Sequence, residues 1–314
     1  MEIYIIRPIK KVFMKLKISL FFFTVFLLAM GINSPAAAAE SINAFVSIPP
    51  QQFFVTAIGK DRVKTTAIVS PAHSPADYEP SPSQMVQMSK ADIYFAVGVP
   101  FETTWLKKFI GVNPDMRIVH TDDGIDKKPI DRYETAASGP IHSKNGHHHH
   151  HETMDPHVWL SPPLVKVQAR HILDALVSID PDHREFYRKN YQDFIGQIAG
   201  LDTDFKALFT QSVRQTKFLV FHPSWGYFAD AYGLTQISIE IEGKTPKARE
   251  VKNLIDFAKT HDIRIIFVQP QFSTKHAEII AKEINGQLIE ADPMAENWLE
   301  NIRSVAESIR QAIK

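Results

Sequence analysis

Two histidine features in the middle of the chain could bind a metal ion. His147 to His151 are five consecutive histidines in a polar stretch, and Met154-Asp155-Pro156-His157-Val158-Trp159-Leu160 follows closely. A tract rich in neutral imidazoles captures metal readily. His157 is of another kind, because a single histidine between a proline and an apolar run is held by backbone and packing. Together they predict a protein that handles a metal ion.

The polyhistidine tract is not by itself proof of metal binding. An expression tag stands at a terminus, whereas this tract lies between Gly146 and Glu152. A low-complexity loop without function stays open, because composition alone identifies no role. If the tract binds metal, we expect His147, His148, His149, His150 and His151 to form an auxiliary site within a His-rich loop, about 134–154, that raises the local metal concentration or senses metal abundance.

Two more potential ligands lie at predicted strand ends. His222 follows the apolar run 218–221, and Asp292 follows the run 288–291. Open parallel sheets bind ligands at the carboxyl ends of their strands, so His157, His222 and Asp292 could meet in a cleft between two halves of the chain. Each residue alone has a simpler reading, because a histidine beside a strand is often only hydrogen-bonded and an Asp before Pro often only forms a turn.

The N-terminal segment is typical of an export signal. Lys15 and Lys17 precede an apolar stretch, 18–32, that is shorter than the roughly 20 residues needed to span a bilayer. Small residues follow, with a cleavage position after Ala39. We expect residues 1–39 to be a cleavable signal peptide and the mature protein to be a soluble periplasmic monomer. An uncleaved membrane anchor is the alternative.

Composition limits the partners and the ligand chemistry. The 35 basic and 35 acidic residues balance, which gives no indication of nucleic acid or an anionic membrane as a partner. The chain has no cysteine, so a disulfide and a thiolate ligand are both excluded. Imidazole, carboxylate and water remain as metal ligands.

Alternating short apolar runs and helical patterns predict an α/β fold with two lobes, each a mainly parallel sheet flanked by helices. The predicted strands are 44–48, 64–69, 93–97, 117–119, 217–221, 236–241, 263–268 and 287–290. The predicted helices of the second half are 224–232 closed by Gly233, 245–260 opened by Thr245-Pro246, 274–285 stopped by Gly286, and 297–313. We expect an N-terminal lobe over 40–180, a connecting helix over 181–212 and a C-terminal lobe over 213–314.

The connecting helix should be long and rigid. A helix is expected after Pro162 and Pro163, to about Val177, and the next should open with Asp180 as N-cap and Pro181 at its first position. Apolar residues then recur every three or four positions, at Tyr187, Tyr191, Phe194, Ile198, Leu201, Phe205 and Leu208. This stripe suits a strut lying across both lobes, although an ordinary surface helix would show the same periodicity.

Four segments resemble the periplasmic zinc- and manganese-binding proteins of ABC transporters. They are Tyr78–Pro82, Asp155–Leu160, Phe221–Phe228 and Glu290–Pro293, in the order expected for that family. The resemblance implies two α/β lobes joined by a rigid helix, with a metal held between them and delivered to a membrane permease driven by a cytoplasmic ATPase. It also implies that His157 and His222 are ligands, that Asp292 is a carboxylate ligand, and that the protein is no enzyme.

One position departs from this family's pattern. Where the family carries its first histidine, this chain has Ala76. His73 lies three residues upstream, and its loop could bring the imidazole to the same ion. Water, a loop histidine, Asp77 or Glu79 could complete the shell instead.

Zinc suits the predicted ligands better than manganese does. Two or three imidazoles with one carboxylate fit its tetrahedral, nitrogen-rich preference, whereas manganese prefers more oxygen ligands and binds more weakly. An exported zinc hydrolase is an alternative, since three ligands and a water form a catalytic site; its base would be Glu240 or Glu242, which could equally well only cap or hydrogen-bond. A manganese carrier, a metal-regulated adhesin or a metallochaperone with this fold also remains open.

Overall fold

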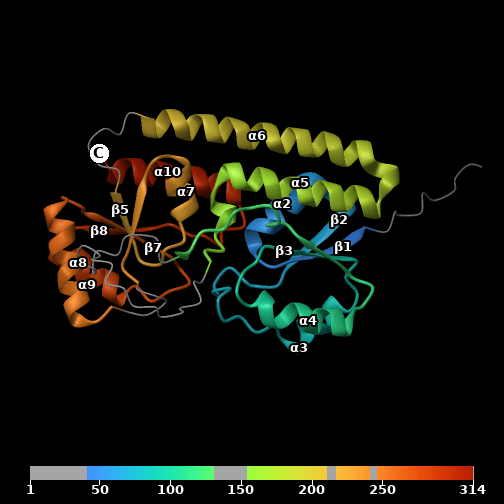
Figure 1. Cartoon of the computed structure of the whole chain (residues 1–314), viewed down its shortest axis with the longest axis horizontal. Coiled ribbons are helices and arrows are strands. Elements are labelled where there is room, and N and C mark those ends of the chain that lie inside the picture. Colours follow the sequence, from blue (N-terminus) through green and yellow to red (C-terminus); the bar gives the residue numbers. More distant parts are fainter. Residues whose placement is uncertain (1–40, 131–153, 211–216, 241–245, 314) are drawn as a thin grey trace, which may run out of the picture. The chain divides into compact units, whose positions relative to one another are not determined.

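The chain folds into two similar α/β lobes (Figure 1). A computed structural model describes residues 41–130, 154–210, 217–240 and 246–313, all within the unit Ser41–Lys314. The expected signal peptide, 1–39, lies outside the described residues. Among the residues that are described, no helix is both long and apolar enough to cross a membrane.

The first lobe is built on a four-stranded parallel sheet with the strand order β2-β1-β3-β4. Its strands are β1 (Ile42–Val46), β2 (Val63–Ala67), β3 (Ile93–Ala96) and β4 (Arg117–His120). All four overlap the predicted strands, although β1 begins two residues before the predicted range 44–48. The central strand β3 is buried along its whole length, as is expected of a parallel strand covered on both faces.

Four helices belong to the described part of this lobe; the first three connect its parallel strands, and the fourth follows the last strand. They are α2 (Pro49–Gly59), α3 (Pro82–Met88), α4 (Glu102–Val112) and α5 (Pro162–Ile179). Helix α5 includes Pro162 and Pro163, which were expected to precede it, because proline has the backbone angle of a first helical residue and lacks only an N–H that needs no partner there. Ser81 caps α3, accepting a hydrogen bond from the backbone N–H of Gln84.

The second lobe repeats the architecture with the order β6-β5-β7-β8. Its strands are β5 (Lys217–Val220), β6 (Thr235–Ser238), β7 (Ile265–Val268) and β8 (Gln287–Glu290). Its helices are α7 (Gly226–Ala231), α8 (Ala248–Thr260), α9 (Lys275–Glu283) and α10 (Trp298–Ala312). The predicted fold class is thereby confirmed in both lobes.

Two helix boundaries of the second lobe depend on particular residues. Gly233 follows α7 with φ +68°, a conformation that costs glycine little and so ends the helix where predicted. Helix α8 begins later than predicted, at Ala248, after Lys247 as N-cap. The side chain of Glu250 accepts a hydrogen bond from the backbone N–H of Lys247, which fixes this start; Thr245 lies outside the described residues.

Helix α6 (Arg184–Thr210) links the lobes and has 27 residues. It is preceded by a 3₁₀ turn, Pro181–His183. The Asp180 carboxylate does not cap the backbone as predicted. It accepts hydrogen bonds from three side chains, those of Arg62 (3.0 Å), His183 (2.7 Å) and Tyr187 (2.7 Å). The corner between α5 and α6 is therefore fixed by a charged network that also includes a residue beside β2.

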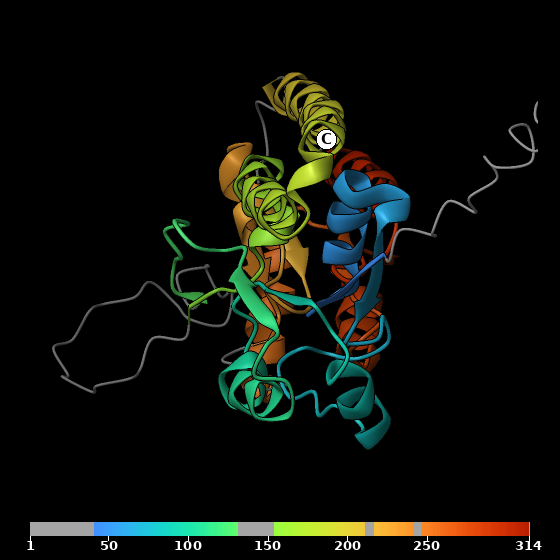
Figure 2. The same cartoon turned by 90° about the vertical axis from the view of Figure 1, so that its right-hand side faces the viewer.

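The apolar stripe of α6 packs on both lobes, so this helix is a strut and not a surface helix of one lobe. In its first half, the Phe194 ring lies 5.9 Å from the ring of Phe54 in α2. In its second half, the Phe205 ring lies 5.6 Å from that of Phe228 in α7. Figure 2 shows α6 nearly end-on, outside α5 and α2. The relation between the lobes therefore depends on one continuous helix.

Replacing Phe205 should destabilise this connection. Phe205 is 2% exposed and also contacts the Tyr232 ring, so Phe205→Ala should reduce the free energy of unfolding by about 3–5 kcal/mol. Chemical denaturation measures the loss. Lys189→Ala on the exposed face of α6 is the matched control and should change stability by less than about 0.5 kcal/mol. A loss in Phe205→Ala no larger than in the control would contradict the role of α6.

Candidate metal site

The rings of His157 and His222 come from different lobes and lie next to each other. Their centroids are 5.3 Å apart, which lets two imidazoles hold one cation. His157 directly precedes the 3₁₀ turn Val158–Leu160 of the first lobe, and His222 comes two residues after β5. The structure thus brings together the two histidines that the sequence predicts to meet.

A carboxylate fixes the orientation of the His157 ring. Oδ1 of Asp155 accepts hydrogen bonds from the backbone N–H of His157 (2.9 Å) and from its ring Nδ1 (2.7 Å). Because an ionised carboxylate only accepts, Nδ1 carries the proton and Nε2 keeps its lone pair. Metal-binding histidines in proteins are commonly oriented in this way.

A second carboxylate does the same for His222. Its Nδ1 lies 2.5 Å from Oε2 of Glu240, in the segment after β6, so Nε2 is again the nitrogen left for a metal. Phe272 stacks on the imidazole at 4.5 Å. The Gln269 amide accepts from the backbone N–H of His222 and donates to its carbonyl oxygen. Glu240 therefore acts as a hydrogen-bond partner, one of the two roles considered from the sequence; Glu242 lies outside the described residues.

The surroundings of His222 favour its neutral form. Burial of the ring lowers the pKa of His222 below its ordinary value, the hydrogen bond with Glu240 opposes that change, and a positive charge on His157 would lower the pKa further. A neutral imidazole is the form that binds metal. His222 is therefore ready to act as a ligand at neutral pH.

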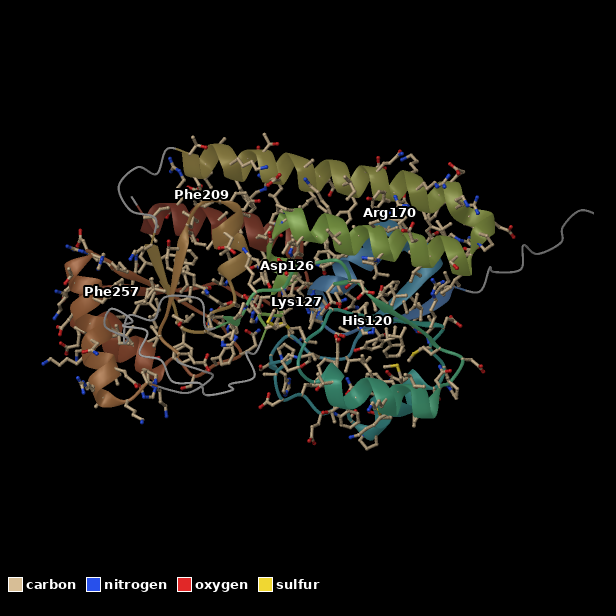
Figure 3. All side chains as sticks on the ribbon, in the orientation of Figure 1. His120, Asp126, Lys127, Arg170, Phe209 and Phe257 are labelled. Atoms are coloured by element: carbon tan, nitrogen blue, oxygen red, sulfur yellow. The ribbon has the colours of Figure 1, made fainter. Side chains whose placement is uncertain are left out.

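Side chains from both lobes hold this pair of histidines in place. The Tyr227 hydroxyl of the second lobe donates to the backbone carbonyl of Asp155 (3.1 Å) and accepts from the backbone N–H of Lys128 (2.9 Å). Lys128 also pairs with Asp230 at 2.9 Å. Figure 3 labels the adjacent Lys127, which lies in the chain segment that follows β4. The backbone of Asp155, whose carboxylate orients His157, is thus bonded to the opposite lobe.

Two tryptophans form another link near the same site. Nε1 of Trp159 donates to the carbonyl oxygen of Pro293 (2.7 Å), and Nε1 of Trp298 donates to the carbonyl oxygen of Trp159 (2.7 Å). Both rings are buried. This pairing places the segment Asp292-Pro293 next to the turn that follows His157.

Only one carboxylate oxygen of Asp292 accepts hydrogen bonds from described residues. Its Oδ1 accepts from Nε2 of Gln271 and from the backbone N–H of Met294, each at 2.8 Å. Its Oδ2 has no hydrogen-bond partner among the residues that the structure describes. Asp292 follows β8, at the carboxyl edge of the second sheet, as predicted.

His73 is an exposed loop residue with one nitrogen already used. Its Nδ1 lies 2.6 Å from the Ser70 hydroxyl, and its ring lies 5.8 Å from the ring of Tyr78. The loop does reach the second lobe, because the carbonyl oxygen of Pro71 accepts from Nε2 of Gln271 at 2.7 Å. Ala76, which stands where a histidine is expected, is also exposed.

The four predicted ligands are not assembled as a set. Over 41–130, 154–210, 217–240 and 246–313, no group of three or more His, Asp or Glu side chains is arranged to hold a metal. The paired histidines are adjacent, whereas Asp292 and the His73 loop are connected to each other through Gln271. The auxiliary histidines, 147–151, lie outside the described residues.

Several site residues were not found from the sequence. Asp155 could have been, because a carboxylate two residues before a histidine can reach its Nδ1. Gln269, Gln271 and Phe272 follow β7 and give no comparable signal, since an amide or a ring after a strand is common in any α/β protein. Only the strand order, with β7 beside β5, reveals that they lie near His222.

Comparison with known proteins identifies the family. A family model described as zinc-uptake complex component A, periplasmic, matches residues 45–312, nearly all of the described chain. The chain belongs to this zinc-uptake family. The resemblance found in the sequence is therefore confirmed. This family, called ZnuA, consists of components of a zinc-uptake complex.

Individual relatives agree with that assignment to the ZnuA family. The high-affinity zinc uptake system protein ZnuA of Bacillus subtilis is 28% identical over 268 residues, which are 82% of this chain and 82% of that protein. A crystal structure of ZnuA has a TM-score of 0.79 and 37% identity, covering 88% of this chain and 100% of its own. A ZnuA deletion mutant with zinc bound has a TM-score of 0.76 and 39% identity, covering 87% and 98%.

Glu240→Gln should test how this ZnuA-family site prepares His222. Loss of the carboxylate removes an interaction that raises the pKa of His222, so that pKa should fall further. The ring also loses its orienting acceptor, and zinc affinity should drop about 10–100-fold. NMR titration of the ring nitrogens and a zinc competition assay measure the two effects. Glu250→Gln on α8 is the control; an unchanged pKa and affinity in Glu240→Gln would exclude this role.

Proposed function

We propose that the protein captures Zn²⁺ between its lobes, outside the cytoplasmic membrane, and delivers it to an ABC permease driven by a cytoplasmic ATPase. The observation that carries the proposal is the pair His157 and His222, whose Nδ1 atoms are each bonded to a carboxylate. Two Nε2 atoms thereby remain for one ion. Imidazole nitrogens suit zinc, and the chain has no thiolate to compete.

The ligand set in this proposal is His157, His222, Asp292 and His73. Oδ2 of Asp292 supplies the carboxylate oxygen, and His73 supplies the third imidazole in place of the histidine missing at Ala76. The Gln271 bridge supports the inclusion of both, because it connects the His73 loop to Asp292. A shift of the loop and of Asp292 towards the histidine pair would complete the shell.

The connections between the lobes favour small adjustments over a wide hinge. Helix α6 packs on both lobes, and the Trp159, Trp298 and Tyr227 hydrogen bonds cross between them near the site. Rigid-body opening of the lobes would break the hydrogen bonds of Trp159, Trp298 and Tyr227. We infer that zinc enters and leaves mainly by movement of loops such as the one carrying His73.

The rest of the proposal concerns export and assembly. Residues 1–39 direct the chain to the periplasm and are removed, and the mature protein acts as a monomer composed of the lobes 40–180 and 213–314 with the connecting segment 181–212. The support for a carrier over a hydrolase is that Glu240 is bonded to a histidine and is not free to act as a base.

Zinc binding by single-site variants tests the function. We expect tight binding of one Zn²⁺ at the interlobe site, abolished by His222→Ala because the second lobe then supplies no imidazole, and weakened by His73→Ala. Affinity is measured by competition with a chelating dye and stoichiometry by elemental analysis. The matched control is His261→Ala on the surface after α8, which should bind like the unmodified chain.

Other outcomes separate the alternatives. Unaltered affinity in His73→Ala would remove His73 from the shell, and unaltered affinity in His222→Ala would overturn the interlobe site. Zinc-dependent turnover of ester, amide or phosphate substrates would favour the hydrolase. Tighter binding of manganese than of zinc would favour the manganese carrier.

Deletion of the polyhistidine tract tests its auxiliary role. Without residues 147–151 we expect fewer zinc ions per chain but one site of undiminished affinity, because the interlobe ligands lie elsewhere. Elemental analysis and dye competition on the same samples measure both quantities. Replacing the five residues by serine controls for loop length, and loss of the tight site in either variant would show that the tract is part of the primary site.

A further inference from the structure

Gln271 connects the two lobes through a single amide group. Its Nε2 donates to the carbonyl oxygen of Pro71 in the first lobe (2.7 Å) and to Oδ1 of Asp292 in the second (2.8 Å). Pro71 and Asp292 are 221 positions apart in the chain, but one NH₂ group joins them. The residue lies in the segment between β7 and α9, one position before the ring that stacks on His222.

The orientation of this amide is determined by its two acceptors. A carbonyl oxygen and a carboxylate oxygen both need a donor, so the NH₂ group must face them. Oε1 of Gln271 is buried and has no hydrogen-bond partner among the described residues. If the amide were flipped, Oε1 of Gln271 would face the oxygens of Pro71 and Asp292, and the two hydrogen bonds would be lost. The observed orientation keeps both hydrogen bonds, although it leaves Oε1 without a partner among the described residues.

The bond from Gln271 makes the two oxygens of Asp292 different from each other. Oδ1 accepts both the Gln271 amide and the backbone N–H of Met294. Two donors occupy the lone pairs of Oδ1, and Oδ2 is the oxygen that remains for a cation. Asp292 can then act as a ligand through one oxygen only.

We propose that Gln271 is a positioning residue that determines metal selectivity, by restricting Asp292 to coordination through a single oxygen and by holding the His73 loop beside it. This inference rests on the proposed function. A carboxylate that binds through one oxygen suits a four-coordinate zinc site. A carboxylate that binds through both oxygens raises the coordination number and the oxygen content, which suits manganese. Gln271 therefore favours zinc without touching it.

The variant Gln271→Met tests this proposal, because methionine has a similar length and shape and no donor. Oδ1 of Asp292 loses one of its two hydrogen bonds and becomes available to the metal. Zinc affinity should fall about 10-fold or more, as expected for loss of a group that orients a ligand. Manganese affinity should fall less or rise, so the ratio of zinc to manganese affinity should decrease at least about 10-fold.

Two control variants distinguish a change in metal selectivity from a general destabilisation of the fold. Gln84→Met removes an amide that donates to the carbonyl oxygen of Ile68 at 2.7 Å; it disturbs the segment before His73 without touching Asp292, and should leave the affinity ratio unchanged. Gln287→Met replaces an exposed glutamine of β8 and should change neither affinity. Zinc and manganese affinities of the full chain are measured by chelator competition, with thermal melting to establish folding.

The possible results separate this inference from the function on which it rests. A decreased zinc-to-manganese ratio in Gln271→Met alone supports the proposal. An unchanged ratio, or equal losses for both metals, overturns it while leaving zinc capture intact. Absence of tight zinc binding in the unmodified chain overturns the proposed function and this inference with it. If Gln271→Met does not fold, Gln271→Glu, which keeps the length and replaces the donor by an acceptor, should show the same decrease, and an unchanged ratio there overturns the proposal.

Discussion

The hydrogen bond from each histidine to a carboxylate is the interaction on which the interlobe site depends. Asp155 and Glu240 hold the protons on Nδ1 of His157 and His222, which leaves two Nε2 lone pairs for one cation. Without these acceptors either ring could rotate or change tautomer. Each acceptor belongs to the same lobe as its histidine, so each lobe orients its own candidate ligand independently of the other lobe.

The contacts between the lobes then determine the distance between the two histidines. Helix α6 packs on both lobes, and near the site the Trp159 and Tyr227 hydrogen bonds cross directly from one to the other. Such an arrangement keeps the two rings close through contacts of the protein itself. A protein that captures a scarce ion benefits from this, because little conformational order has to be gained when the ion binds.

Much of this structure follows from the sequence by simple rules. Apolar runs predict the strands, and the ends of parallel strands predict where His222 and Asp292 lie. The start of α6 is harder to predict, because the Asp180 carboxylate accepts hydrogen bonds from the side chains of Arg62, His183 and Tyr187 and does not cap the backbone. Gln271 could not be recognised, since its importance comes from two acceptors that only the fold brings together. The participation of His157, His222, Asp292 and His73 in one ligand shell remains a prediction.

The uninterrupted helix α6 has a consequence for how this protein can vary in evolution. In its first half, Asn190 donates to the carbonyl oxygen of Ile58 in α2; in its second half, Asp202 accepts from the hydroxyl of Tyr232, which directly follows α7. Each residue advances a helix by roughly 100° of rotation and 1.5 Å of length. One residue inserted between these anchors would turn the second lobe away from the first. The number of residues between Asn190 and Asp202 is therefore constrained by the relative orientation of the two lobes.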